Sequence, residues 1–156
     1  MKLKILVGTM TNTAEYVAQA IQMDCADLVD EIEIAMMDGL DIGVFDEDAL
    51  YLICTSTYGS GDVPDNARNL YDSLELQPKY LGAVRYGVIA LGDRTYAQTF
   101  AFGGRKFDER LQGLGARRIG ELFIHDASEG TMPEELGTAW CREWLPQALA
   151  AMRVTA

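Results

Sequence analysis

Apolar and polar positions follow two alternating patterns along the chain, one typical of strands and one typical of helices. The run that begins at Asp48 is apolar at nearly every position, as expected for a strand covered on both faces. The run that begins at Glu31 alternates, as a less buried strand does. The five predicted strands are Leu3–Val7, Glu31–Met37, Asp48–Ser56, Arg85–Gly92 and Ala116–His125.

Helical spacing of apolar residues fills the segments between these strands. The first predicted helix runs from about Thr13 to Met23, and its apolar residues share one face. The second opens at Pro64, because proline is tolerated in a first helical turn. The third stops at Gly115, since glycine is common directly after a helix end.

A last helix is predicted near the end of the chain. Thr131 and Glu134 have the spacing of a capping box and mark its start. Trp140 and Trp144 continue its apolar face and are interpreted as core residues. Pro146 is expected to kink the helix or to end it early.

The order of these elements predicts the fold class. Five strands alternating with helices indicate an α/β domain with a parallel sheet and helices on both faces, a three-layer sandwich that spans residues 1–156. In such sheets, ligands bind outside the carboxyl ends of the strands, at the point where the strand order reverses. The loops after the first, third and fourth strands are therefore the candidate site.

Composition and charge limit the classes of molecule that this protein can bind. The formal charge of −11 would repel nucleic acid and anionic membranes and would attract basic proteins. No apolar run approaches the roughly 20 residues of a membrane helix, so a soluble, cytoplasmic protein is expected. A monomer is expected as well. Cys25, Cys54 and Cys141 are odd in number and widely spaced, which favours reduced thiols over a disulfide framework or a zinc site.

The loop after the first strand is rich in hydroxyl groups. Thr9, Thr11 and Thr13, the amide of Asn12 and the free N–H groups of a helix start can bind a phosphate without a basic side chain. Neither G-x-x-x-x-G-K-[ST] nor G-x-G-x-x-G is present, so a terminal monophosphate suits this loop better than a triphosphate or a dinucleotide. The alternative is that Asn12 and Thr13 only cap the helix, with Glu15 as the box partner.

The other two loops each carry a tyrosine. Tyr58 precedes Gly59 and Gly61, so a flat ring could pack on Tyr58 while the backbone runs along the edge of that ring. A glycine turn with an incidental tyrosine is the alternative. After the fourth strand, backbone groups near Asp93 could meet the polar edge of a heterocycle, and Tyr96 could cover its face. Together the loops predict a slot for a phosphorylated planar heterocycle.

The stretches "GTMTNTAE", "TSTYGSGDVPDNA" and "LGDRTY…GGRKFDERLQGLGARRI" resemble the three flavin loops of flavodoxins, including the small stand-alone MioC type and the FMN domains of sulfite reductase and cytochrome P450 reductase. The resemblance implies a sheet of order 2-1-3-4-5 with noncovalent FMN at the point where the order reverses, the arrangement for which flavodoxin is a standard example. It also implies an electron carrier rather than an enzyme, supplied by a separate NAD(P)H-dependent reductase of flavodoxin/ferredoxin type.

The resemblance also implies roles for individual residues. Tyr58 and Tyr96 would flank the isoalloxazine, the Gly59 carbonyl would accept the flavin N5 hydrogen in the semiquinone, and Asn12, where the family usually has glycine, could adopt the left-handed backbone that Asn tolerates. An acidic group near the flavin is expected from Asp62, Asp65, Asp93, Asp126 and Glu129. The implied FMN-binding residues are Thr9, Met10, Thr11, Asn12 and Thr13 at the phosphate, Thr55, Ser56 and Thr57 near the ribityl chain, and Tyr58, Gly59, Ser60, Gly61, Leu91, Gly92, Asp93, Tyr96 and Phe100 in the second and third loops.

Two other functions share this topology. A quinone or azo reductase would bind NAD(P)H and a small substrate over the flavin, but no acid or base is evident beside the slot, and His125, the single histidine, is interpreted as a hydrogen-bonded strand-end residue. A phosphoacceptor signalling domain would need acidic residues where this chain has Gly8, Thr9, Thr55 and Ser56.

Overall fold

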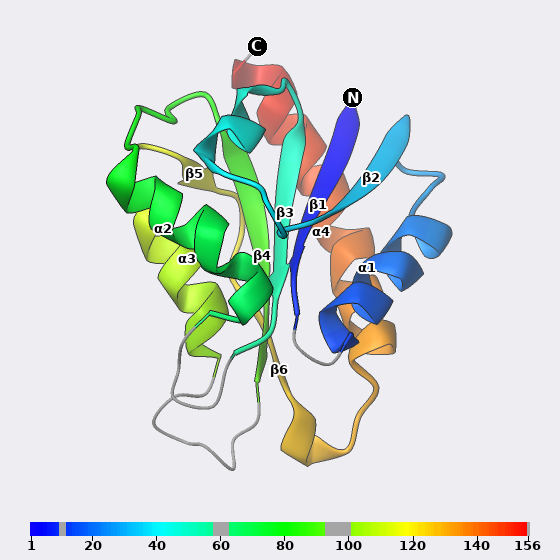
Figure 1. The fold of residues 1–156 in the computed structure, drawn as a ribbon. Helices are drawn as coiled ribbons and strands as arrows, with labels where there is room; N and C mark the ends of the chain where they lie inside the picture. Colours follow the sequence, from blue (N-terminus) through cyan, green and yellow to red (C-terminus); the bar gives the residue numbers. More distant parts are fainter. Residues whose placement is uncertain (10–11, 58–62, 93–100, 156) are drawn as a thin grey trace.

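The computed structural model describes residues 1–9, 12–57, 63–92 and 101–155, which form one parallel sheet with helices on both faces (Figure 1). The strand order is β2-β1-β3-β4-β5, and β6 also pairs with β4, so the predicted order 2-1-3-4-5 is confirmed. The strands are β1 (Lys2–Gly8), β2 (Glu31–Met36), β3 (Leu50–Thr55), β4 (Arg85–Gly92), β5 (Arg117–Arg118) and β6 (Phe123–Asp126).

Helices α1 and α4 cover one face of the sheet, and α2 and α3 cover the other (Figure 1). Each face has its own apolar core, because side chains of the central strands alternate between the two faces and are buried on both. The helices are α1 (Thr13–Asp24), α2 (Arg68–Leu76), α3 (Phe102–Gly113) and α4 (Pro133–Thr155), and the short 3-10 helices are η1 (Ile42–Asp46), η2 (Asp65–Ala67) and η4 (Ala127–Glu129).

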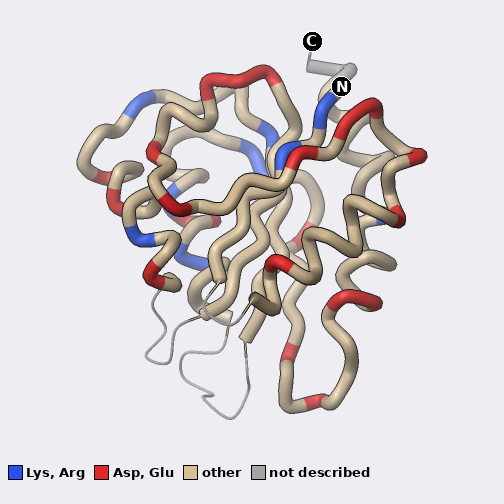
Figure 2. Tube along the Cα trace, turned by 45° about the vertical axis from the view of Figure 1, so that its right-hand side comes forward, with Lys and Arg blue, Asp and Glu red and all other residues tan. Residues whose placement is uncertain are grey.

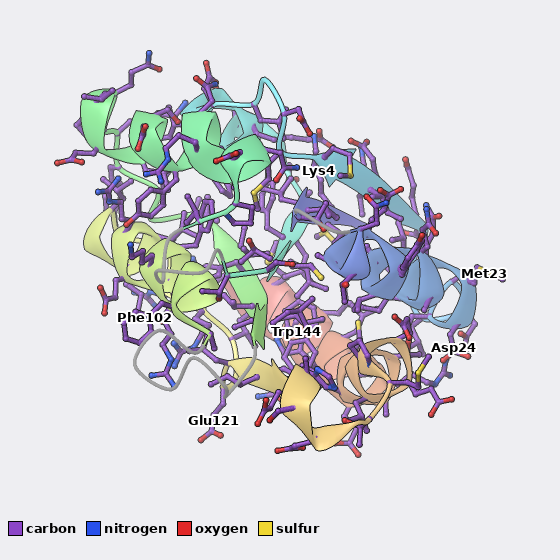
Figure 3. All side chains as sticks on the ribbon, turned by 60° about the horizontal axis from the view of Figure 1, so that its bottom comes forward. Lys4, Met23, Asp24, Phe102, Glu121 and Trp144 are labelled. Carbon is purple, nitrogen blue, oxygen red and sulfur yellow. The ribbon has the colours of Figure 1, made fainter. Side chains whose placement is uncertain are left out.

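The fifth position of the sheet differs from the single strand predicted over Ala116–His125. Both β5 and β6 pair in parallel with β4, with Tyr86 opposite Arg118 and Ile89 opposite Phe123. Between these two pairs β4 advances three positions, whereas the segment opposite advances five, so it carries two extra residues. The extra residues bend out at Gly120, which has φ +74°. Trp144 of α4 fills this break: its Nε1 donates a hydrogen bond of 2.8 Å to the Ile119 carbonyl (Figure 3).

The last helix also differs from its prediction at both ends. It begins at Pro133, and the Thr131 hydroxyl lies 2.9 Å from His125 Nε2, so Thr131 does not start a capping box. It continues through Pro146 to Thr155. Leu145 and Ala148 on either side of the proline are fully buried against the sheet, and this burial outweighs the roughly 3 kcal/mol that proline costs inside a helix.

The second helical segment begins with η2 rather than with a regular α-helix at Pro64, and α2 follows from Arg68. None of the helices in the described part of the chain is both long and apolar enough to cross a membrane.

Candidate functional site

The carboxyl ends of β1, β3 and β4 lie next to one another, because the three strands are parallel and neighbours in the sheet. The pairing aligns Gly8 with Thr55, and Thr55 with Ala90. Gly8 is required here: a Cβ at this position would lie 2.6 Å from Thr55 Oγ1. The chain therefore leaves β1 in close contact with β3, at the edge where the candidate loops begin.

Thr9 is the first residue beyond β1 and is buried, with 9% of its surface exposed. Its backbone N–H donates a hydrogen bond of 2.8 Å to Asn66 Oδ1. Among the residues that the structure describes, its hydroxyl is the one buried side-chain oxygen or nitrogen without a hydrogen-bond partner. Because an unpaired buried hydroxyl costs free energy, this oxygen is suited to meet a ligand.

Asn12 precedes α1 with φ 68° and ψ 0°, the left-handed conformation that the sequence predicted. Its carbonyl accepts from Tyr16 N at 3.0 Å, but within the described part of the chain its side chain makes no cap hydrogen bond. Glu15 accepts instead from Gln19 Nε2 at 3.2 Å. The alternative in which Asn12 caps the helix with Glu15 is therefore wrong. Thr13 opens α1, so its hydroxyl lies at the positive end of the helix dipole.

The residues beyond β3 connect three segments of the site. Ser56 N donates to the Gly8 carbonyl at 2.9 Å, and Thr55 Oγ1 donates to the Ser56 carbonyl at 3.1 Å. Thr57 Oγ1 donates to the Leu91 carbonyl and accepts from Gly103 N, both at 3.0 Å. The Thr57 hydroxyl thus holds the end of β4 and the start of α3 to the segment after β3, a role that the sequence did not predict.

Asn66, in η2, is the residue of the site that sequence reasoning missed. Its amide contacts Thr9 and the Val7 carbonyl at the end of β1, and Asp38 after β2, two segments that lie far from it along the chain. Asp38, Asp65, Thr9 and Asn66 line a small cleft at this edge. The sequence feature that could have indicated Asn66 is its amide side chain, which directly follows Pro64 and Asp65 in the second loop.

Acidic residues lie beside the same edge of the sheet, on the segment that leads from β6 into α4 (Figure 2). Asp126 pairs in register with Gly92 at the ends of β6 and β4, and its carboxylate accepts from Ser128 N at 2.9 Å. Residues 126–135 contain Asp126, Glu129, Glu134 and Glu135 and no lysine or arginine. Asp65 is exposed beside Thr9, whereas Asp62 and Asp93 of the predicted acidic group lie outside the described residues.

His125 and the cysteines match their predicted structural roles. His125 is buried, and its Nε2 contacts the Thr131 hydroxyl. All three cysteines are free and buried, and burial raises the pKa of the Cys54 thiol to about 12, so Cys54 is protonated at neutral pH. No cluster of three or more potential metal ligands occurs among the described residues.

The remaining predicted site residues divide into two groups. Leu91 and Gly92 form the end of β4 at the site, so the structure places them beside Thr57 and Asp126. The predictions for the others lie outside the described residues: Met10, Thr11, Tyr58, Gly59, Ser60, Gly61, Asp93, Tyr96 and Phe100.

The described residues define a class of protein. A doubly wound parallel sheet of order 2-1-3-4-5 is a flavodoxin-like domain. Where the order reverses, the Thr9 hydroxyl is buried without a partner among the described residues, and the Asn12 side chain makes no cap hydrogen bond there, features that suit a phosphorylated ligand. A phosphate at this edge would not need a basic side chain, since neutral donors and the helix dipole would supply the attraction.

Known proteins share both the sequence and the fold of this chain. A family model described as Flavodoxin matches residues 5–140. The chain is 36% identical to Flavodoxin YqcA of Pectobacterium carotovorum over 140 residues, 90% of this chain and 92% of that protein. It is 35% identical to bovine NADPH–cytochrome P450 reductase over 151 residues, 91% of this chain but 21% of the reductase. The solved structure of a C101A flavodoxin mutant from Pseudomonas aeruginosa superposes with a TM-score of 0.80 at 33% identity, covering 95% of this chain and 99% of that one.

The chain therefore belongs to the flavodoxin family. It is an FMN-binding electron-transfer protein, and these relatives do not favour the predicted alternative of a quinone or azo reductase.

Proposed function

We propose that this chain holds FMN with its phosphate at the β1–α1 turn and passes electrons one at a time from a separate NAD(P)H-dependent reductase to acceptor proteins. The observation that carries the proposal is the Thr9 hydroxyl, buried at the carboxyl edge of the sheet with no partner among the described residues. A phosphate oxygen would satisfy it, because phosphate accepts several hydrogen bonds.

The donors of the phosphate loop fit this cofactor. Asn12 precedes α1 in a left-handed conformation, and within the described residues its side chain makes no hydrogen bond to the first turn of the helix. The N–H groups of that turn and the Thr13 hydroxyl would face the phosphate together with Thr9 and the predicted donors Met10 and Thr11. The loop would thus bind a monophosphate dianion with neutral groups.

The ring would lie between the second and third loops. When bound, FMN supplies the redox chemistry, while the protein supplies binding, orientation and electrostatics. Tyr58 and Tyr96 would pack on the two faces of the ring, with Gly92 and Asp93 at its pyrimidine edge. The Gly59 carbonyl would accept the hydrogen at flavin N5, which would separate the two one-electron steps. Ser56 and Thr57 would support the ribityl chain through backbone groups, since the Thr57 hydroxyl holds Leu91 and Gly103.

The acidic surface of the chain supports partners that carry basic patches. The chain has 24 acidic and 13 basic residues, and residues 126–135 beside the site are acidic only. Such a surface would steer the carrier toward basic patches on a cytoplasmic reductase and on acceptor proteins, in encounters that weaken with salt. The chain is also similar to NADPH–cytochrome P450 reductase, and this similarity supports electron flow from a reductase toward acceptor proteins.

Purification and spectroscopy test the proposal directly. The purified protein should be yellow, and denaturation should release FMN rather than riboflavin or FAD, as identified by chromatography. Reduction should require a separate reductase. A colourless protein that does not take up added FMN contradicts the proposal, and rapid oxidation of NADPH by the isolated protein would indicate an enzyme instead of a carrier.

A further inference from the structure

Asn66 makes three hydrogen bonds through one side-chain amide. Its Oδ1 accepts from Thr9 N at 2.8 Å, and its Nδ2 donates to Asp38 Oδ1 at 3.1 Å and to the Val7 carbonyl at 3.3 Å. These contacts use both N–H groups of the amide and one acceptor position of its oxygen. The orientation of the amide is consistent, because each donor faces an acceptor.

The three contacts join η2 to two other segments of the chain. Val7 lies near the end of β1, Thr9 begins the loop after it, and Asp38 follows β2. Asn66 itself lies in η2, which leads from the second loop into α2. The Val7 carbonyl also accepts from Met37 N at 2.9 Å, so the start of the β1–α1 turn is fixed to both neighbouring segments.

This arrangement decides which group of Thr9 can meet a ligand. The Thr9 N–H is already donated to Asn66, so it cannot also point at a phosphate. The Thr9 hydroxyl is buried, and among the described residues it has no partner. We propose that Asn66 is a positioning residue for the FMN phosphate: it holds the Thr9 backbone so that Thr9 binds the phosphate through its hydroxyl and not through its amide.

This proposal rests on the FMN-binding function proposed above. It adds that phosphate recognition depends on a residue outside the phosphate loop, 57 positions along the chain from Thr9. If Asn66 only stabilised the fold, its loss would weaken every flavin to the same extent. If it positions the phosphate donor, its loss weakens FMN but leaves riboflavin, which lacks the phosphate, nearly unchanged.

The experiment compares the affinities of the apoprotein for FMN and for riboflavin. Asn66→Ala should weaken FMN about tenfold, the effect of losing one well-placed hydrogen bond to a charged group, and should change riboflavin by about twofold at most. Thr9→Val, which keeps the shape but removes the hydroxyl, should have the same selective effect, and Thr9→Ser should retain tight FMN binding. The 31P resonance of bound FMN should shift in Asn66→Ala, because the phosphate loses a fixed donor.

The chain offers a matched control one helical turn away. Asn69 Nδ2 donates to the Leu40 carbonyl at 2.8 Å, a side-chain to backbone bond of similar length on the same segment that does not involve Thr9. Asn69→Ala should leave the ratio of FMN to riboflavin affinity unchanged. Far-UV circular dichroism of each apoprotein checks that the variants fold.

Two substitutions of equal size, Asn66→Asp and Asp38→Asn, test the hydrogen bonds of Asn66 without creating a cavity. Asn66→Asp keeps the acceptor for Thr9 N but turns a second oxygen toward Asp38 and the Val7 carbonyl, so FMN binding should weaken. Adding Asp38→Asn restores the original net charge and one hydrogen bond between the two residues, and should recover part of the selectivity. Asn69→Asp, which adds the same charge nearby, controls for simple repulsion of the phosphate.

The outcomes are distinct. Equal losses for FMN and riboflavin in both Asn66 variants, or an Asn69→Asp effect as large as that of Asn66→Asp, would overturn the positioning role. Wild-type protein that binds neither flavin would instead contradict the proposed function itself. If Asn66→Ala does not fold, the Asn66→Asp series decides by the same ratio.

Discussion

The two ends of the sheet differ in whether their charged and buried polar groups are paired within the protein. At the amino end, Lys2 and Lys4 each pair with both Glu33 and Glu47 on the neighbouring segments, at distances from 2.5 to 3.3 Å. The buried Tyr51 hydroxyl there donates to the Glu47 carbonyl at 2.7 Å. Charged and buried polar groups at this end are thus matched within the protein, as expected for a surface that only stabilises the fold.

At the carboxyl end, groups are left unmatched or held in costly conformations. Among the described residues, Asn12 and Ala101 are the two non-glycine residues with positive φ, at 68° and 61°. Each precedes a helix that starts at this edge, and within the described part of the chain neither side chain caps its helix. The unpartnered Thr9 hydroxyl lies at the same edge.

This contrast locates function independently of any motif. A left-handed non-glycine residue costs on the order of 1–2 kcal/mol, and an unpaired buried hydroxyl costs about 1–3 kcal/mol. Such costs persist where the surrounding structure holds them and where a ligand can use them. We therefore propose that the carboxyl end is arranged for binding, so that substitutions there should change cofactor affinity, whereas those at the amino end should change stability alone.

The largest effect is expected at the helix start. Thr13→Val removes the hydroxyl at the first residue of α1 and should weaken FMN about tenfold to a hundredfold, the range for a hydrogen bond to a charged group, while riboflavin changes little. Fluorescence titration of the apoprotein measures both affinities. Thr138→Val, which removes a hydroxyl that donates to the Glu134 carbonyl inside α4, is the control and should leave both affinities unchanged. Equal weakening of the two flavins would show that Thr13 does not bind the phosphate.

The close contact between α3 and the second loop comes next. A Cβ at Gly103 would lie 2.3 Å from the Ser56 carbonyl oxygen, so Gly103→Ala should push these segments apart and destabilise the protein by about 1–3 kcal/mol. Urea unfolding measures the loss. Gly113, at the other end of α3, has no neighbouring atom within 4 Å of its Cβ position among the described residues, and Gly113→Ala should be neutral or stabilising by up to about 1 kcal/mol. A loss of similar size at both positions would contradict the contact.

The left-handed Ala101 allows a test of opposite sign. Ala101→Gly should stabilise the protein by less than about 1 kcal/mol, because glycine adopts φ 61° without the Cβ penalty, but the change also removes a fully buried methyl group and frees the unfolded chain. Gly130→Ala is the reciprocal change: this glycine has φ 75° and open space around it among the described residues, so the alanine should be destabilising by about 1 kcal/mol. A loss of more than about 1 kcal/mol in Ala101→Gly, beyond what the buried methyl group accounts for, would show that the conformation is not strained.

Hydrophobic patterning predicted most of this architecture, because buried strands and amphipathic helices are local signals. A left-handed Asn12 was expected through the resemblance, because Asn12 stands where flavodoxins usually have glycine and Asn tolerates that conformation better than most residues. The break between β5 and β6 was not, because it depends on how Trp144 packs beside Gly87 and reaches Ile119 from another element. The prediction that Pro146 would kink or end the last helix failed for the same reason. Proline disfavours a helix locally, but the burial of its neighbours against the sheet keeps this helix continuous.

The site was predicted less completely than the fold. The hydroxyl-rich turn indicated a phosphate, but Asn66 was missed because its three partners are brought together only by the parallel crossovers. Thr57 was placed near the ribityl chain and phosphate by the resemblance to flavodoxins. The bonds of its hydroxyl to β4 and to α3 were not predicted, because they depend on long-range contacts.

The smallest effect, and the one that completes the comparison, is expected at the amino end. Hydrogen bonds from Lys2, and then from Lys4, hold the pKa of Glu47 below its usual value of 4.5. A lowered folded-state pKa means that the ion pairs stabilise the protein above the unfolded pKa and that this stability is lost as the pH falls through the folded pKa. Glu47→Gln should therefore lower the melting temperature slightly near pH 7, and the difference from wild type should vanish in acid and shrink in high salt, because the groups are exposed.

Asp48→Asn, which removes one negative charge from the next residue, separates the ion pairs from a general charge effect. Both variants should bind FMN as tightly as wild type, since the site lies at the opposite end of the sheet. A loss of FMN affinity in Glu47→Gln would mean that the two ends are coupled, and the division between a stabilising end and a binding end would then be wrong.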